Sequence, residues 1–240
     1  DGILLDRDRP TVTKTRISGH ARQSVTQQIV RVDRKSDAPP SPQLQAALAD
    51  YIRTHIDSVD AVVCSDYGDG TLATPVIAAA LAHPLSIVDA QTRLDRYQNA
   101  TIFTPNLPEA EKAVGYSLIE AGGDADLALL RRGGTDLLHL TNAQKILITR
   151  GEDGMSLFQK DGPEHHIPAF NRTDVFDVTG AGDTVAAALT LALALGATPW
   201  EAAVLGNLAA SIVVRQFGTT TTNPTEMKTA LSLLLEELNA

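Results

Sequence analysis

The sequence predicts an α/β fold, in which a mostly parallel central sheet is covered by helices on both faces. Two observations support this prediction. From residue 61 onward, short apolar runs such as "AVVC" and "KILIT" alternate with longer segments whose apolar residues recur at helical spacing. The chain has 240 residues, 43% of them hydrophobic, which is enough for one substantial buried core. We therefore expect residues 1–240 to form a single domain.

The N-terminal part of the chain has a different pattern. The runs "TVTKTRIS" and "SVTQQIVRVD" are rich in β-branched residues, so residues 10–35 are expected to form strands. A break rich in proline and serine, "SDAPPSP", follows them. In the next segment, "PQLQAALADYIRTHI", the apolar residues have helical spacing, and Pro42 suits the first turn of a helix.

The later elements follow from the same two periodicities. Strands are expected at "DAVVCSD", "LSIVDA", "TIFTPN" and "KILITR", and a hairpin over 154–170 is expected to turn at Asp161–Gly162. The helices are expected around 71–82, from near Pro108, from near Asp124, and over 183–195, 199–216 and 224–238.

Composition narrows the class of function. The net charge of −9, the pI of about 5.1 and the lack of a long basic run argue against nucleic acid and anionic membranes as partners. The longest apolar run, residues 185–197, is too short to span a bilayer. The single cysteine, Cys64, cannot form an internal disulfide, which fits a reducing compartment. We expect a soluble cytoplasmic protein that acts on small molecules.

Polar segments follow four of the expected strands: "SDYGDG", "DAQT", "TPNLPE" and "TRGEDG". In open α/β sheets, ligands bind in the crevice outside the carboxyl ends of the strands. Each segment alone is also what an ordinary turn requires. Because all four fall at the same edge of the predicted sheet, together they indicate a site there.

The segment "DVTGAGDTV", Asp177 to Val185, is the most informative. Gly180 and Gly182 let backbone N–H groups approach a ligand, and the start of the following helix favours an anion such as phosphate. The simpler reading is a glycine turn with Asp183 in the first helical turn, where the helix dipole favours it. Neither a G-x-G-x-x-G fingerprint nor a Walker A loop fits the spacing. An anion hole beside a carboxylate base is what phosphoryl transfer requires.

The same residues carry a resemblance. "DVTGAGDT" resembles the C-terminal signature of the ribokinase-like (PfkB-type) carbohydrate kinases. The resemblance implies a three-layer α/β/α fold with a small β lid, here residues 10–35. It also implies that Asp183 is the catalytic base and that Gly180, Ala181 and Gly182 form the anion hole, with amides supplied by residues 181–183.

The resemblance extends to nucleotide and metal contacts. It implies ATP and Mg²⁺ as cofactors, with Asn106 and Glu109 of an N-x-x-E motif organising Mg²⁺ largely through water. The loop "FGTTTTNP" is similar to one that approaches the nucleotide and a monovalent cation such as K⁺, and it could equally be a plain capping loop. Asn207 could equally be a satisfied helix asparagine. The residues implied beside ATP are Thr149, Gly151, Gly154, Thr179 and Asn207.

Within that family, the strongest likeness is to the kinase domain of bacterial heptose-phosphate kinases, which is commonly fused to an adenylyltransferase. Runs such as "RPTVTKTRI", "SDYGDG" and "LITRGEDGMSL" carry it over nearly the whole chain. The resemblance implies transfer to the anomeric hydroxyl of a heptose 7-phosphate. Asp69 and Gln91 stand where that group has lysines. Lys14 and Arg16 are candidates for a sugar phosphate, and Asp66 for the sugar or Mg²⁺, although Asp66 also suits a turn cap.

Two alternatives stay open. The acceptor could be another sugar, such as a ketose or nucleoside, or the protein could be a silent relative that binds nucleotide or sugar without turnover. The resemblance also implies about ninety further residues upstream, with a first strand and a sugar-binding motif. Finally, lid strands in this family often pair across dimers, so a homodimer through residues 10–35 is expected.

Overall fold

The computed structural model describes residues 2–19, 27–36, 38–119, 127–170 and 175–238. Its main feature is a six-stranded sheet in which the strands follow chain order. The first four strands pair in parallel, and the last two are antiparallel additions at one edge. The strands are β3 (Val62–Asp66), β4 (Ser86–Ala90), β5 (Ile102–Phe103), β6 (Lys145–Thr149), β7 (Met155–Gln159) and β8 (His165–Ile167). The expected mostly parallel sheet is confirmed.

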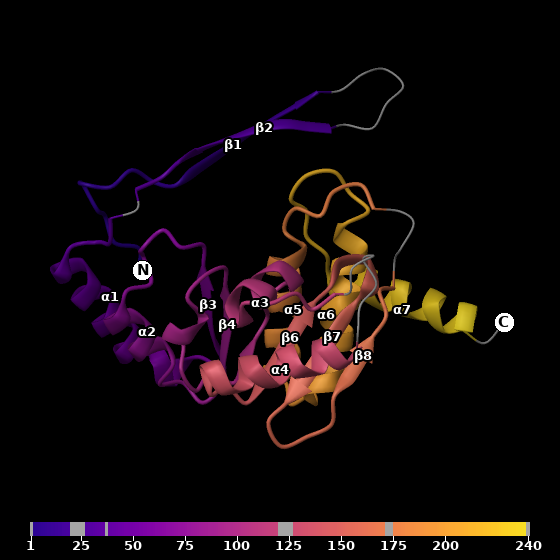
Figure 1. Cartoon of the computed structure of the whole chain (residues 1–240). Helices are drawn as coiled ribbons and strands as arrows, with labels where there is room; N and C mark the ends of the chain where they lie inside the picture. The colour runs from indigo at the N-terminus through magenta and orange to yellow at the C-terminus, as the bar shows by residue number, and fades with distance from the viewer. Residues whose placement is uncertain (1, 20–26, 37, 120–126, 171–174, 239–240) are drawn as a thin grey trace.

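Helices cover both faces of this sheet (Figure 1). They are α1 (Pro42–His55), α2 (Thr74–Ala80), α3 (Leu107–Val114), α4 (Leu127–Thr141), α5 (Ala181–Ala194), α6 (Pro199–Val213) and α7 (Pro224–Leu238). Neighbouring strand residues point to opposite faces, so Val88 packs with α2, α3 and α4 whereas Ile87 packs with α5 and α6. The two buried clusters make the fold a three-layer α/β/α arrangement.

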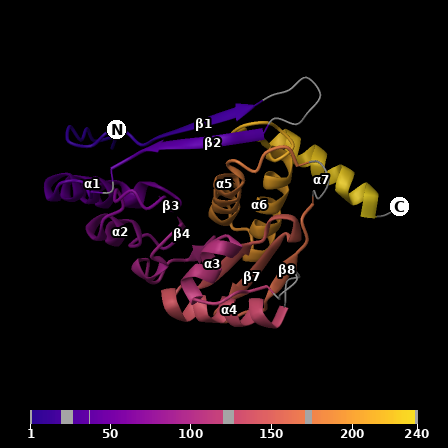
Figure 2. The ribbon, with the colours of Figure 1, turned by 45° about the horizontal axis from the view of Figure 1, so that its top comes forward.

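The N-terminal strands form a separate antiparallel hairpin. The strands β1 (Thr13–Gly19) and β2 (Gln27–Arg34) pair with each other in a two-stranded sheet, with an irregularity between Ile17 and Ser18. Figure 2 shows this hairpin lying across the molecule on the side of α5 and α6, away from α4. The apolar side chains Ile29, Val30 and Val32 are exposed on it.

Local chemistry sets the element boundaries. The helix α5 begins at Ala181, two residues earlier than expected, because Gly180 adopts a left-handed conformation with φ +82° and ends the preceding loop. The expected start of α4 near Asp124 lies outside the described residues. Within the part of the chain that the structure describes, no helix combines the length and the apolar character needed to cross a bilayer.

Candidate active site

The loop before α5 leaves backbone donors free. Among the described residues, no side chain caps this helix, and no acceptor is paired with the N–H groups of Gly182 and Asp183. The N–H of Ala181 is different, because it donates to the carbonyl of Val178 at 3.2 Å. A Cβ added at Gly182 would meet no atom within 4 Å, so the space beside these amides is open. Two of the three expected amides are therefore available to an anion.

Asp183 lies on the exposed side of the first turn of α5. Its Oδ1 accepts a hydrogen bond of 2.9 Å from the hydroxyl of Tyr67, which lies in the turn after β3. The two residues are 116 positions apart, so the contact joins the segments "SDYGDG" and "TGAGDT". The sequence singled out the first segment but not Tyr67 itself, and only its place at a strand end hinted at a role.

Two further carboxylates face this region, Asp89 near the end of β4 and Glu109 in α3. Burial raises the pKa of Asp89 to about 6, with smaller contributions from the charges of Glu109 and Asp183. Burial also raises the pKa of Glu109. The pKa of Tyr67 rises to about 12 through burial, its hydrogen bond to Asp183 and the three carboxylate charges. This edge of the sheet therefore has a negative potential that favours a cation.

The N-x-x-E motif also has a structural role. Asn106 Oδ1 accepts from the Glu109 amide, and Glu109 Oε2 accepts from the Asn106 amide, both at 2.9 Å, which forms a capping box for α3. Asn106 also bridges to Thr149 at the end of β6. The cap fixes the Glu109 carboxylate at the carboxyl edge of the sheet, where oxygen ligands would suit Mg²⁺. Within the described ranges, no three His, Cys, Asp or Glu side chains form a preassembled metal cluster.

A pocket of about 570 Å³ lies beside the free amides, within the size range of small-molecule and cofactor sites. It brings together six of the residues expected near ATP or the transferring phosphate: Thr149, Gly151, Gly154, Ala181, Gly182 and Asn207. Apolar side chains, including Met155, Phe170 and Val185, form other parts of its wall. A lining that combines apolar side chains with polar groups is suited to a nucleobase.

Asn207 is held inside the pocket wall. Its side chain is 4% exposed, and its Nδ2 donates to the carbonyl of Pro168 at 2.7 Å. This hydrogen bond is what we expect if Asn207 is a buried helix asparagine whose side chain is paired within the protein. Gly154, which also lines the pocket, has φ +83°, and a Cβ there would lie 2.0 Å from the carbonyl oxygen of Ile167. Only glycine fits that position.

Thr179 and Asp177 shape the loop rather than line the pocket. The carboxylate of Asp177 accepts from the N–H of Thr179 at 2.9 Å and from that of Gly218 at 3.1 Å. The hydrogen bond from Thr179 is the main cause of the lowered pKa of Asp177, and the charge of Arg16 also contributes. Asp177 thus ties the loop before α5 to the threonine-rich loop at 219–222.

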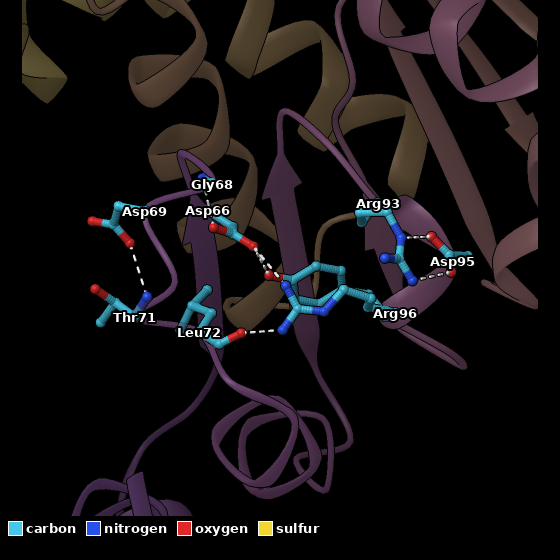
Figure 3. Close-up of polar contacts among 9 residues, drawn as sticks. Asp66, Gly68, Asp69, Thr71, Leu72, Arg93, Asp95 and Arg96 are labelled. Carbon is cyan, nitrogen blue, oxygen red and sulfur yellow. Dashed lines mark hydrogen bonds and ion pairs between the residues drawn. The ribbon is translucent and has the colours of Figure 1, made fainter. Parts of the chain in front are cut away.

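Asp66 is buried and engaged within the protein (Figure 3). Its Oδ1 accepts from the N–H of Gly68 at 2.8 Å, and its Oδ2 accepts from the hydroxyl of Tyr97 at 2.6 Å. Arg96 lies 3.7 Å from the same Oδ2 and donates to the carbonyl of Leu72. Both carboxylate oxygens are occupied, so we assign Asp66 to the turn and leave it out of the proposed substrate contacts.

The strand β1 brings cations to the site. The ammonium group of Lys14 lies 4.1 Å from the centre of the Tyr67 ring, and Arg16 is close enough to influence Asp177. Asp69, at one lysine position, uses its carboxylate to accept from the N–H of Thr71 at 2.9 Å. Arg9 donates to the backbone carbonyl of Asp69 at 2.6 Å, which places a positive charge at the same turn.

Solved structures with the same fold include a ribokinase and a phosphofructokinase. Ribokinase from Arabidopsis thaliana, solved with ribose and ATP, aligns with 97% of this chain and 73% of its own, with a TM-score of 0.70 and 19% identity. Phosphofructokinase-2 from Escherichia coli, solved with potassium, aligns with 88% of this chain and 67% of its own, with a TM-score of 0.69 and 19% identity. The fold is therefore ribokinase-like, as expected.

The sequence comparisons define the family. The model for pfkB family carbohydrate kinases matches residues 9–226, and the chain belongs to that family. The bifunctional protein HldE of Pelobacter propionicus is 38% identical over 239 residues, which cover 97% of this chain and 46% of that protein. HldE of Shewanella baltica is 39% identical over 234 residues, with 96% and 46% covered. The chain spans about half the length of the curated relatives it matches.

Proposed function

We propose that this chain forms the catalytic part of an ATP-dependent carbohydrate kinase, which transfers the γ-phosphoryl group of ATP to a sugar hydroxyl. One observation carries the proposal. The exposed carboxylate of Asp183 lies in the same helical turn as its own N–H and that of Gly182, neither of which a described residue pairs. A pocket of about 570 Å³ lies beside them. A base and an anion hole at one place are the two parts that phosphoryl transfer needs from the protein.

The proposed chemistry follows from these positions. Asp183 accepts the proton of the acceptor hydroxyl, and the sugar oxygen forms a bond to the γ-phosphorus while the bond to the bridging oxygen of ADP breaks. The N–H groups of Gly182 and Asp183 stabilise the charge on the transferring group. Glu109 and Asp89 would hold Mg²⁺, mainly through water, and the ion would neutralise phosphate charge. The threonine-rich loop is where we place a monovalent cation such as K⁺.

For the acceptor, we favour the anomeric hydroxyl of heptose 7-phosphate. Support comes from the likeness to HldE proteins over almost the whole chain and from the lid cations Lys14 and Arg16, which suit a sugar phosphate. Asp69 and Gln91 replace two expected cations, so a ketose or nucleoside acceptor is the second candidate. A silent relative is the third candidate. The exposed carboxylate of Asp183, beside amides that no described residue pairs, argues against it.

We also propose a homodimer formed through the lid hairpin. Four apolar side chains are exposed on its strands, which is unusual for a ribbon facing only water: Ile17, Ile29, Val30 and Val32. The protein would work in the cytoplasm, where ATP is available and where its one cysteine, buried Cys64, stays reduced.

The test is ADP release by the complete protein in a coupled assay, with heptose 7-phosphate, fructose and ribose compared at equal concentration. We expect the highest kcat/KM with heptose 7-phosphate. A higher value with fructose or ribose would refute the proposed acceptor and leave the kinase assignment standing. Measurable ATP binding with no ADP release from any sugar would support the silent relative instead.

A further inference from the structure

Tyr67 lies at the junction of three segments of the chain. Its hydroxyl donates to Asp183 Oδ1 at 2.9 Å, and the Lys14 ammonium group lies over its ring at 4.1 Å from the centre. One side chain thus contacts both the first turn of α5 and the lid strand β1. The ring is 42% exposed, so it is accessible to the site rather than part of the core.

The backbone that carries Tyr67 is firmly held. Asp66, the residue before it, bonds to Gly68, to Tyr97 and to Arg96, as Figure 3 shows for the labelled partners. Gly68 has φ +72°, which allows the tight turn. Since the backbone of Tyr67 is fixed on both sides, its ring offers a stable support for groups that approach from the lid or from α5.

The electrostatic surroundings keep Tyr67 a hydrogen-bond donor. Burial and the nearby carboxylates of Asp183, Asp89 and Glu109 raise its pKa to about 12, so its hydroxyl is protonated at neutral pH. A positive charge over the ring face is attracted by the aromatic quadrupole. Lys14 also brings its charge towards a region that is otherwise negative.

From this geometry we infer that Tyr67 is a positioning residue, which links the seating of the lid strand to the orientation of the catalytic base. The inference rests on the proposed kinase function. The hydroxyl of Tyr67 holds Oδ1 of Asp183, and the described residues leave Oδ2 without a partner, so Oδ2 is the oxygen directed to the acceptor hydroxyl. The Lys14 contact restrains the Tyr67 ring when β1 lies over the site.

The first test is Tyr67→Phe in the complete protein. This change keeps the ring and its contact with Lys14 but removes the bond to Asp183. We expect kcat to fall roughly 5- to 30-fold, which is the scale of one hydrogen bond to a charged group. KM for ATP should stay within about twofold, because no ATP contact is lost. An unchanged kcat would overturn the inference.

The chain provides a matched control in Tyr116. Its hydroxyl donates to Asp136 at 2.7 Å, and Arg132 lies 4.5 Å from the centre of its ring. A tyrosine, a carboxylate and a basic side chain therefore meet here too, outside the site. Tyr116→Phe should lower the melting temperature about as much as Tyr67→Phe while leaving kcat unchanged. An equal loss of kcat in both variants would mean that Tyr67 acts only through stability.

The second test concerns Lys14. Lys14→Met should lower kcat, and Lys14→Arg should restore most of the loss, because arginine also stacks on aromatic rings. In a Tyr67→Leu background, which has no ring, Lys14→Met should have less than half its original effect on log kcat. Full additivity would show that Lys14 does not act through Tyr67 and would overturn the link to the lid. If the unaltered protein has no activity with any sugar, the proposed function fails first.

Discussion

Replacing Asp183 with asparagine separates catalysis from binding and folding. Asparagine keeps an oxygen that can accept from Tyr67, so the hydrogen bond between these two side chains can survive. It cannot accept the proton of a sugar hydroxyl. We expect kcat to fall by roughly 10²- to 10⁴-fold, the usual contribution of a general base. This loss corresponds to about 3–5.5 kcal/mol in the activation barrier.

The other properties should barely change. Asp183 is exposed and holds no cap, so we expect the free energy of unfolding to stay within about 0.5 kcal/mol. ATP affinity should be equal or tighter, because a negative charge beside the phosphates is removed while the free amides remain. The assays are coupled ADP release, calorimetric ATP titration and urea unfolding. Retention of kcat within about threefold, at normal ATP affinity, would refute the assignment of Asp183 as the base.

Three further substitutions test the site through the stability of the folded protein. Asp89→Asn should raise the free energy of unfolding at pH 7.5 by about 1–2 kcal/mol, less than the full shift implies because the side chain is partly solvated. Gly154→Ala should cost about 3 kcal/mol or more, since its Cβ would strike the backbone beside β8. Gly151→Ala, with φ +58° but open space around its Cβ, should cost only about 1 kcal/mol.

The sign of the Asp89 effect follows from its raised pKa. The folded protein binds this proton more tightly than the unfolded chain, so stability is lost as pH rises from about 4 towards 6. Asparagine removes that loss of stability. The gain in the free energy of unfolding that is expected at pH 7.5 should vanish at pH 3.5. Urea titrations at pH 3.5 and pH 7.5 measure the free energy of unfolding of the unaltered protein and of the variant. An equal gain in the free energy of unfolding at pH 3.5 and 7.5 would contradict an electrostatic origin of the Asp89 effect. Equal losses of stability from the alanine substitutions at Gly151 and Gly154 would contradict the packing argument.

The sequence predicted the layers of the fold because strand and helix periodicities are local. It placed Thr149 and Gly151 at the edge of the sheet where strand ends meet, whereas the family resemblance alone placed Gly182 and Asn207 near them. All four residues line one pocket. The contact of Tyr67 with Asp183 could not be predicted, because a pairing across 116 residues leaves no periodic signal. The same applies to the burial of Asp66, whose partners Arg96 and Tyr97 come from a turn far along the chain.

Some motif residues of this site also stabilise a helix by capping it, whereas others do not. At α3, Asn106 and Glu109 cap the helix, so substituting either residue would disturb folding and metal binding together. At α5, the described residues provide no side-chain cap, and Asp183 gives the helix only the modest interaction of a first-turn carboxylate with the helix dipole. A helix that begins with free amides and an exposed carboxylate forgoes the stability that a cap would give. For this reason α5, rather than α3, is where a loss of activity reports directly on the chemistry.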